Sequence, residues 1–131
     1  MNNKRLFTVK EANKLIPFLN TTITALRRVN DKLETASLEG PTEEDITLSG
    51  GLLVNRNYIR LLTRFQSLTD EIHAEGCRLK DVGSGLVDFP TVWEGREVYL
   101  CWQFGESEIQ HWHELEAGFT GRHPLQHKTI A

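Results

Sequence analysis

The sequence predicts an α+β fold: a long antiparallel helical hairpin, followed by a small antiparallel β-sheet and a short C-terminal helix. Over residues 8–76, apolar residues recur at alternating steps of three and four, which is the helical period. After Gly76 the apolar period falls to two, as in strands. All three Trp, both Cys and four of the five His lie after this boundary. We therefore expect a single domain over 1–131, with a helical hairpin over 8–76 and a β-rich unit over 77–125.

Size and charge exclude several classes of protein. The chain has 131 residues, of which 39% are hydrophobic, and a formal net charge of −3. This length suits one globular domain, and the negative charge argues against a nucleic-acid-binding protein. No apolar run approaches the roughly 18 residues of a membrane span. The N-terminal stretch lacks the apolar segment of a signal peptide, so we expect a cytoplasmic protein.

The first helix has a clear start. Thr8 is a good N-cap, and Glu11 three residues later completes a capping box. Pro17 removes one backbone donor and is expected to kink the helix near its first turns. We expect the helix to run from 8 to about 38. Its apolar seam is Leu15, Leu19, Thr22, Leu26, Val29, Leu33 and Ala36.

The second helix follows a connection over 39–51, which we expect to be a loop, and Gly76 suits the position just after its end. Two facing seams predict an antiparallel hairpin of coiled-coil type. The stripes are wider than one seam, so we expect a homodimer in which two chains form a four-helix bundle. The second seam is Val54, Tyr58, Leu61, Phe65, Leu68 and Ile72. The residues expected in the core or dimer seam are Leu19, Leu26, Leu33, Tyr58, Leu61, Phe65 and Leu68.

Arg56, Arg60 and Arg64 form a stripe at helical spacing. A phosphate or nucleic-acid contact is one interpretation. The other is a solvated face with ion pairs to Asp31 and Glu34 on the first helix. Because the first 76 residues hold ten basic and ten acidic side chains, the second interpretation is favoured.

The β-rich unit begins with a short strand at 77–82 and a turn at Gly83-Ser84-Gly85. Two further β-rich runs, 86–93 and 96–104, are separated by Glu94-Gly95, which predicts a hairpin with Trp93 opposite Arg96. Pro90 cannot donate to a ladder, so the first strand is an edge there or is broken by a bulge. This register places six residues on the core face: Val87, Phe89, Thr91, Val98, Leu100 and Trp102. On the other face, Asp88 lies near Cys101 and Tyr99.

Two structures compete over the segment that follows. Ser107 and Gln110 form a capping box and Gly118 is a plausible end, which predicts a short helix over 108–117. In a helix, His111 and His113 point about 200° apart and cannot share a metal. In an extended strand they share one face and can chelate together. We favour the helix.

Imidazole and carboxylate groups in this half of the chain suggest a divalent transition metal, namely Zn, Mn or Fe. The candidate ligands are Asp88, His111, His113, Glu114 and Glu116. The His-Trp-His-Glu run matches no established metal motif. The competing interpretation, which we favour, is that the histidines bond to carboxylates or backbone and hold the unit together. Cys77 and Cys101 are expected to be small buried hydrophobic residues.

Arg122 follows a glycine-bracketed turn and, with Arg96, is a candidate for binding a small anion. The alternative is an internal ion pair of Arg122 with Glu106, Glu108 or Asp88. The acidic surplus nearby favours that alternative.

Several segments in order resemble a known family: Gly85-Leu-Val-Asp-Phe-Pro90, Gly95-Arg-Glu-Val-Tyr-Leu-Cys-Trp102, Gly105-Glu106, Trp112-His113-Glu114 and Gly118-Phe-Thr-Gly-Arg122. The opening Phe7-Thr8-Val9 and Leu15-Ile16-Pro17 are similar as well. The chain resembles the uncharacterised prokaryotic proteins grouped as domain of unknown function 2203. The resemblance implies one compact domain in a bacterial cytosol, and it implies no activity.

Three functions follow from these observations, and the first is favoured narrowly. The first is a dimeric helical assembly or interaction module with a protein partner, which needs no catalytic residue. The second is a metal-binding protein that uses the His, Glu and Asp cluster, with a small metal-dependent hydrolase as one form of it. The third is a small-anion-binding protein that uses Arg122 and Arg96.

Overall fold

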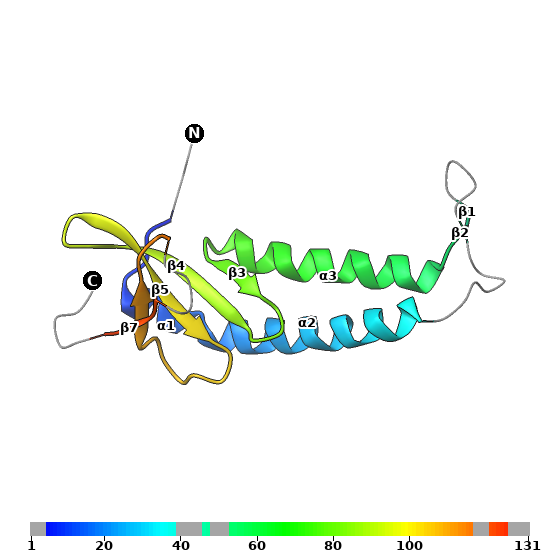
Figure 1. The fold of residues 1–131 in the computed structure, drawn as a ribbon, viewed down its shortest axis with the longest axis horizontal. Coiled ribbons are helices and arrows are strands. Elements are labelled where there is room, and N and C mark those ends of the chain that lie inside the picture. The colour runs from blue at the N-terminus through cyan, green and yellow to red at the C-terminus, as the bar shows by residue number, and fades with distance from the viewer. Residues whose placement is uncertain (1–4, 39–45, 48–52, 117–120, 126–131) are drawn as a thin grey trace.

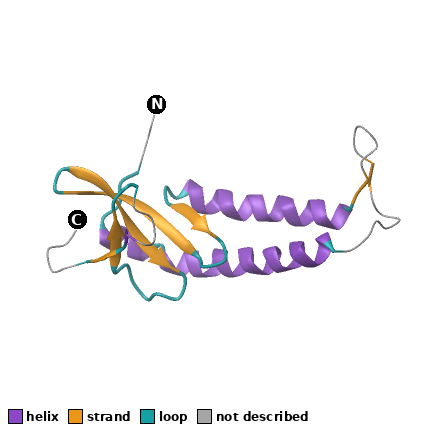
Figure 2. Cartoon of the chain, viewed as in Figure 1, coloured by secondary structure: helices purple, strands orange, loops and turns teal. Residues whose placement is uncertain are grey.

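The computed structural model describes residues 5–38, 46–47, 53–116 and 121–125. It combines helices with a five-stranded antiparallel sheet, so the predicted α+β class is confirmed. The helices are α1 (Val9–Lys14), α2 (Ile16–Ser37) and α3 (Arg56–Ala74). The strands of the sheet gather at one end of the α2–α3 pair, and the rest of the pair extends beyond them (Figures 1 and 2).

The first helix is broken, which corrects the expectation of one continuous helix. The predicted capping box is present, with Thr8 accepting from the Glu11 N–H at 3.1 Å and Glu11 accepting from the Thr8 N–H at 2.9 Å. The break falls at Leu15, between α1 and α2. Pro17 lies in the first turn of α2, where its missing N–H costs no helical bond. Proline in this position explains why the chain starts a new helix instead of bending one.

Helix α3 begins after Asn55, whose side chain accepts from the Tyr58 N–H at 3.0 Å. It ends at Ala74, and Gly76 follows with φ +97°, a conformation that glycine adopts without strain. Helices α2 and α3 lie side by side and run in opposite directions (Figure 1). Of the expected seam, three residues are buried and four are partly exposed. The buried ones are Leu19, Leu26 and Leu68, and the others are Leu33, Tyr58, Leu61 and Phe65.

The connection between α2 and α3 was expected to be a loop, but it contains two short strands. Strand β1 (Ile46–Thr47) pairs antiparallel with β2 (Leu53–Val54), so Val54 lies in a strand and not in the second helix. The remainder of the connection lies outside the described residues.

The main sheet has the order β3-β4-β5-β6-β7. Its first three strands are β3 (Arg78–Asp81), β4 (Leu86–Trp93) and β5 (Arg96–Gln103). The predicted register of the β4–β5 hairpin is confirmed, from Trp93 opposite Arg96 to Leu86 opposite Gln103. Glu94 and Gly95 both have positive φ, at 49° and 75°, as a tight primed turn requires.

Pro90 lies where its missing donor costs nothing. Strand β3 pairs with β4 only as far as Asp88, so β4 is an edge at Pro90 on that side, as the sequence allowed. The Pro90 carbonyl accepts instead from the N–H of Phe7 at 2.7 Å. The N-terminal segment is thereby attached to the sheet.

The predicted helix over 108–117 is wrong among the residues described. Strand β6 (His111–His113) pairs with β5, and β7 (His123–Pro124) pairs with β6. Pairing with β5 gives this segment backbone hydrogen bonds within a sheet, whereas a short helix on its own is only marginally stable. In addition, the N–H of Ile109 donates to Asn13 Oδ1 at 2.6 Å, which ties this segment to α1. Tertiary bonds therefore override the local capping pattern.

One face of the sheet forms the core with the helices. Val87, Phe89, Val98, Leu100 and Trp102 on this face are each 0% exposed. They belong to the same apolar cluster as residues of the N-terminal segment and helices, including Phe7, Leu19, Ile23, Leu26 and Ile72. Among the described residues, no helix is long and apolar enough to cross a membrane.

Candidate metal centre

The opposite face of the same strands carries a buried polar cluster. Asp88 from β4, Cys101 from β5 and His113 from β6 are 1%, 0% and 2% exposed. One ligand atom from each of the three residues lies within 4.8 Å of the other two. Because the three strands are adjacent in the sheet, the backbone ladder fixes the spacing of the cluster. A carboxylate, a thiol and an imidazole in this arrangement can hold a metal ion.

The histidine in this cluster has a defined tautomer. His113 Nδ1 lies 2.7 Å from the backbone oxygen of Glu114, which can only accept, so Nδ1 carries a hydrogen and donates it. His113 Nε2 lies 3.0 Å from Asp88 Oδ1. A lone pair on Nε2 and a carboxylate oxygen repel each other at this distance. A hydrogen therefore lies between these two atoms in a hydrogen bond, and a metal ion can take the same place.

Cys101 adds a third donor. Burial raises the pKa of the Cys101 thiol to about 12, with a further increase from the neighbouring Asp88 carboxylate and an opposing decrease from the Arg122 guanidinium. Without a cation the thiol is therefore protonated at neutral pH. A bound metal ion stabilises the thiolate directly, since a coordinating thiol is deprotonated.

An ion pair supports the cluster from one side. Arg122 Nη2 lies 2.8 Å from Glu106 Oε1 and also donates to the Cys101 carbonyl at 3.2 Å. The Gln103 N–H donates to the same Glu106 oxygen at 2.7 Å. The predicted internal ion pair of Arg122 is thus confirmed, with Glu106 as its partner. These bonds fix the Glu106 carboxylate beside β5.

The other predicted ligands do not join Asp88 and His113. Glu114 is exposed and lies 3.6 Å from Arg96, and Glu116 is exposed. His111 Nδ1 lies 3.5 Å from Glu106 Oε2. Of the five predicted metal ligands, the structure brings Asp88 and His113 together, and the complete set stays a prediction.

The two arginines proposed for anion binding have separate surroundings. The guanidinium of Arg96 lies 5.6 Å and 5.9 Å from the ring centroids of Trp93 and Trp112. Arg122 contacts Glu106 and the Cys101 carbonyl. Anion binding by this pair stays a prediction.

Sequence reasoning missed Cys101, which it treated as a small hydrophobic residue. The signal was present in the predicted register, because that register already placed Cys101 opposite Asp88. The prediction did not include β6, the third strand of the site, which carries His113. With 108–117 taken as a helix, His113 had no reason to approach either residue.

Taken together, the fold and the cluster define a class: a small α+β protein with a buried carboxylate, thiol and imidazole on one sheet face. The chain belongs to the family described as Uncharacterized conserved protein (DUF2203), whose family model matches residues 5–125. No curated protein and no solved structure shows significant similarity to it.

Proposed function

We propose that this protein binds a divalent transition metal ion through Asp88, Cys101 and His113. The observation that carries the proposal is the buried contact between His113 Nε2 and Asp88 Oδ1, at 3.0 Å, with Nδ1 already committed as a donor. A metal ion can take the place of the hydrogen in this contact, and the buried Cys101 thiol beside the pair offers a third donor of a kind that transition metals bind.

The spacing of the donors suits a small ion. Zinc binds nitrogen and oxygen ligands at about 2.0–2.2 Å, so two such ligands of a tetrahedral ion lie about 3.3 Å apart. The observed 3.0 Å between the Asp88 and His113 atoms is close to that value. Only small side-chain shifts are needed to admit the ion.

The charges also balance. A carboxylate and a thiolate carry two negative charges between them, and a divalent ion cancels both. The Glu106–Arg122 pair beside the cluster is neutral as a whole. A buried site with no net charge avoids most of the desolvation cost of an uncompensated ion. The thiolate favours Zn²⁺ or Fe²⁺ over Mn²⁺, which prefers oxygen ligands.

Asp88→Asn provides the sharpest test. The amide N–H can donate to His113 Nε2, so the variant should stay folded, but the neutral amide is a poor ligand for Zn²⁺. Added Zn²⁺ should raise the melting temperature of the wild-type protein and leave that of Asp88→Asn unchanged. Asp81→Asn, at the Ser84 turn away from the cluster, is the matched control and should respond like wild type. Equal zinc stabilisation of wild type and Asp88→Asn would refute the proposal.

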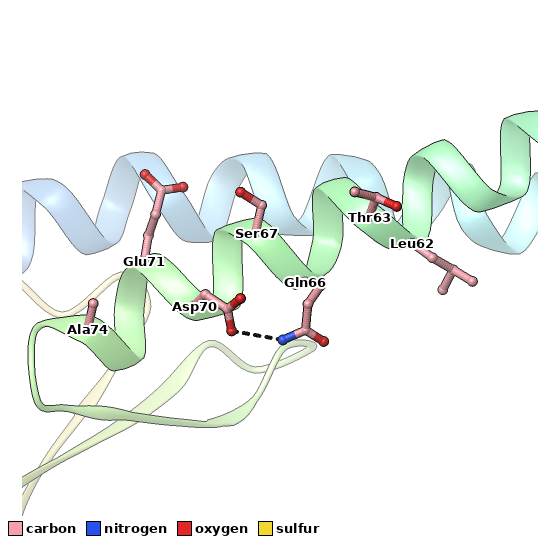
Figure 3. Close-up of a pocket in the computed structure, with 7 residues that line it drawn as sticks. All are labelled: Leu62, Thr63, Gln66, Ser67, Asp70, Glu71 and Ala74. Carbon is pink, nitrogen blue, oxygen red and sulfur yellow. Dashed lines mark hydrogen bonds between the residues drawn. The ribbon is translucent and has the colours of Figure 1, made fainter.

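A second candidate function, self-association, rests on the outer face of α3. A groove of about 710 Å³ runs along this face. Figure 3 shows its lining side chains projecting from one helix, with Gln66 bonded to Asp70 at 2.8 Å. The lining residues are Leu62, Thr63, Gln66, Ser67, Asp70, Glu71 and Ala74. Leu62 is 45% exposed, so a partner covering this groove would bury apolar surface.

The charges on α3 suggest what covers this groove. Arg60 and Arg64 lie in the first half of the helix, and Asp70 and Glu71 lie in the second. This order opposes the helix dipole, which favours acidic residues near the N-terminus and basic ones near the C-terminus. A second α3 packed antiparallel on the groove would place each basic half against an acidic half. We propose a two-fold symmetric dimer formed in this way.

Charge reversal tests the dimer. The double variant Arg60→Glu/Arg64→Glu and the double variant Asp70→Lys/Glu71→Lys should each be monomeric in sedimentation. An equimolar mixture of the two should form a heterodimer, because the surfaces become complementary again. A wild-type protein that sediments as a monomer at micromolar concentration would contradict the dimer and would leave the metal proposal untouched.

Reduced cysteines fit a cytoplasmic location, which we propose for the protein. Both Cys77 and Cys101 are free and buried in the structure. Such thiols persist in a reducing compartment.

A further inference from the structure

We propose that His111 is the fourth ligand, so that the ion is enclosed by Asp88, Cys101, His111 and His113. This inference rests on the metal-binding function proposed above and specifies its coordination. It assigns the site to a closed, four-coordinate class. A catalytic metal site keeps one position open for water or substrate, whereas a closed site serves structure, storage or sensing.

The strand register places His111 beside the cluster. Asp88 on β4 is the direct partner of Cys101 on β5, and Cys101 is the direct partner of His111 on β6. The three residues thus form a straight row across three adjacent strands. Directly opposite residues have Cβ atoms about 4.5–5.5 Å apart and project from the same face. His113 follows His111 by two positions, so it projects from this face too.

In both histidine rings Nδ1 faces an oxygen atom, although only the Nδ1 of His113 makes a hydrogen bond to it. His113 donates Nδ1–H to the Glu114 carbonyl at 2.7 Å. His111 Nδ1 lies 3.5 Å from Glu106 Oε2, and it is buried with no hydrogen-bond partner among the described residues. Histidines that bind metal commonly donate the other ring N–H to a carboxylate or a carbonyl. In both rings this leaves Nε2 as the ligand atom.

The carboxylate beside His111 is already fixed in place. Glu106 accepts from Arg122 Nη2 at 2.8 Å and from the Gln103 N–H at 2.7 Å through the same oxygen, Oε1. Its other oxygen, Oε2, is the one that faces His111. A shift of a few tenths of an ångström would turn this approach into a hydrogen bond. Glu106 is therefore a positioning residue for His111 and not itself a ligand.

One movement is required. The donor atoms that lie within 4.8 Å of one another come from Asp88, Cys101 and His113, so the His111 ring must turn toward Cys101 when the ion binds. The His111 side chain is 29% exposed, which leaves it space to turn. The resulting ligand set has one sulfur, two nitrogens and one oxygen. Zn²⁺ accepts this set in tetrahedral geometry.

Cobalt(II) substitution tests the fourth ligand. Co²⁺ added to the full chain should give the intense visible bands of a tetrahedral ion together with thiolate-to-cobalt charge-transfer absorption. His111→Ala should keep the charge-transfer band, because Cys101 remains, and lose most of the visible intensity. Its affinity for Co²⁺ should fall by more than about 100-fold, while Glu106→Gln should cost about 10–100-fold. His73→Ala, an exposed histidine on α3, is the matched control and should change neither property.

A second measurement guards against indirect effects of the substitution. In the wild-type protein, nitrogen-15 spectra of the imidazole rings should show Zn²⁺ bound at Nε2 of both His111 and His113. Zinc bound at His113 alone, or wild-type cobalt spectra and affinity in His111→Ala, would overturn the fourth ligand and leave a three-ligand site open to water. That outcome would favour a metal-dependent hydrolase. If the wild-type protein binds neither ion, the underlying metal proposal fails as well.

Discussion

The two faces of the β4–β5 hairpin are both buried but differ in chemistry. On the face toward the helices, Val87, Phe89 and Leu100 are 0% exposed and belong to the apolar core cluster. On the opposite face, Asp88 and Cys101 are buried to the same extent, yet they carry a carboxylate and a thiol. The same two strands, with alternating side chains, build both faces.

The difference in chemistry marks the polar face as the one that carries the candidate site. Burial of the apolar face is favourable in itself, at about 25 cal/mol per Å² of apolar surface. Burial of the polar face is unfavourable unless each charge is paired. Burial of Asp88, Cys101 and His113 therefore needs compensating interactions, of which the His113–Asp88 hydrogen bond is one and the proposed metal ion would be a second. The two faces should therefore differ in their response to substitution, pH and zinc.

The largest effect is expected on the apolar face. Phe89→Ala removes a ring that packs edge-on against Phe7, with centroids 5.2 Å apart. The free energy of unfolding should fall by about 3–5 kcal/mol in chemical denaturation. Val92→Ala, at a residue that is 40% exposed on the same strand, should stay within about 0.5 kcal/mol of wild type. A loss below about 1 kcal/mol for Phe89→Ala would show that this face is not the core.

On the polar face, Asp88→Ala should be less costly without metal. It leaves His113 Nε2 without its partner in a buried position, and the expected loss is about 1–3 kcal/mol. Asp88→Asn retains a donor to Nε2 and should lose less than Asp88→Ala. Equal losses for the two variants in metal-free denaturation would show that the hydrogen bond contributes nothing.

When zinc is bound, the two cysteines should contribute differently to the dependence of stability on alkaline pH. Burial raises the pKa of both thiols, Cys77 and Cys101, to about 12 from an ordinary value near 9.0. The folded state therefore binds more protons than the unfolded state between these values, and stability should fall as pH rises from about 9 to about 12.

Bound zinc should weaken that dependence, because Cys101 is then a thiolate at every pH in this range. Cys77→Ala should weaken it further in the zinc-loaded protein. Denaturation midpoints measured at pH 8 to 11 test this. An identical pH slope with and without zinc would argue against Cys101 as a ligand.

The smallest effect is a gain in stability. Thr91 is 0% exposed on the apolar face, and its hydroxyl has no hydrogen-bond partner among the described residues. Thr91→Val replaces the hydroxyl by a methyl group of similar size. Unfolding free energy should rise by about 1 kcal/mol or less, since an unsatisfied buried hydroxyl is unfavourable. A loss of more than about 1 kcal/mol would show that the hydroxyl has a bonded partner in solution.

The sequence predicted the two faces but not the site. Alternation and the Glu94-Gly95 turn were enough to set the hairpin register, because a one-residue slip would expose every core side chain. The capping residues around 108–117 predicted a helix, and only the partners offered by the β5 edge and Asn13 reveal a strand. Once His111 and His113 lie in a strand, they share a face with Cys101. Long-range pairing of this kind leaves no local signal in one sequence.

The most direct test of the metal site is the metal content of untagged protein purified without chelator. The account predicts about one zinc or iron ion per chain in the wild type and in Cys77→Ser, and none in Cys101→Ser. The two cysteines are equally buried and have similarly raised pKa values, so they differ mainly in their neighbours. A wild-type protein that contains no metal and takes up none when zinc is added would contradict the account. Retention of the ion in Cys101→Ser would contradict it as well.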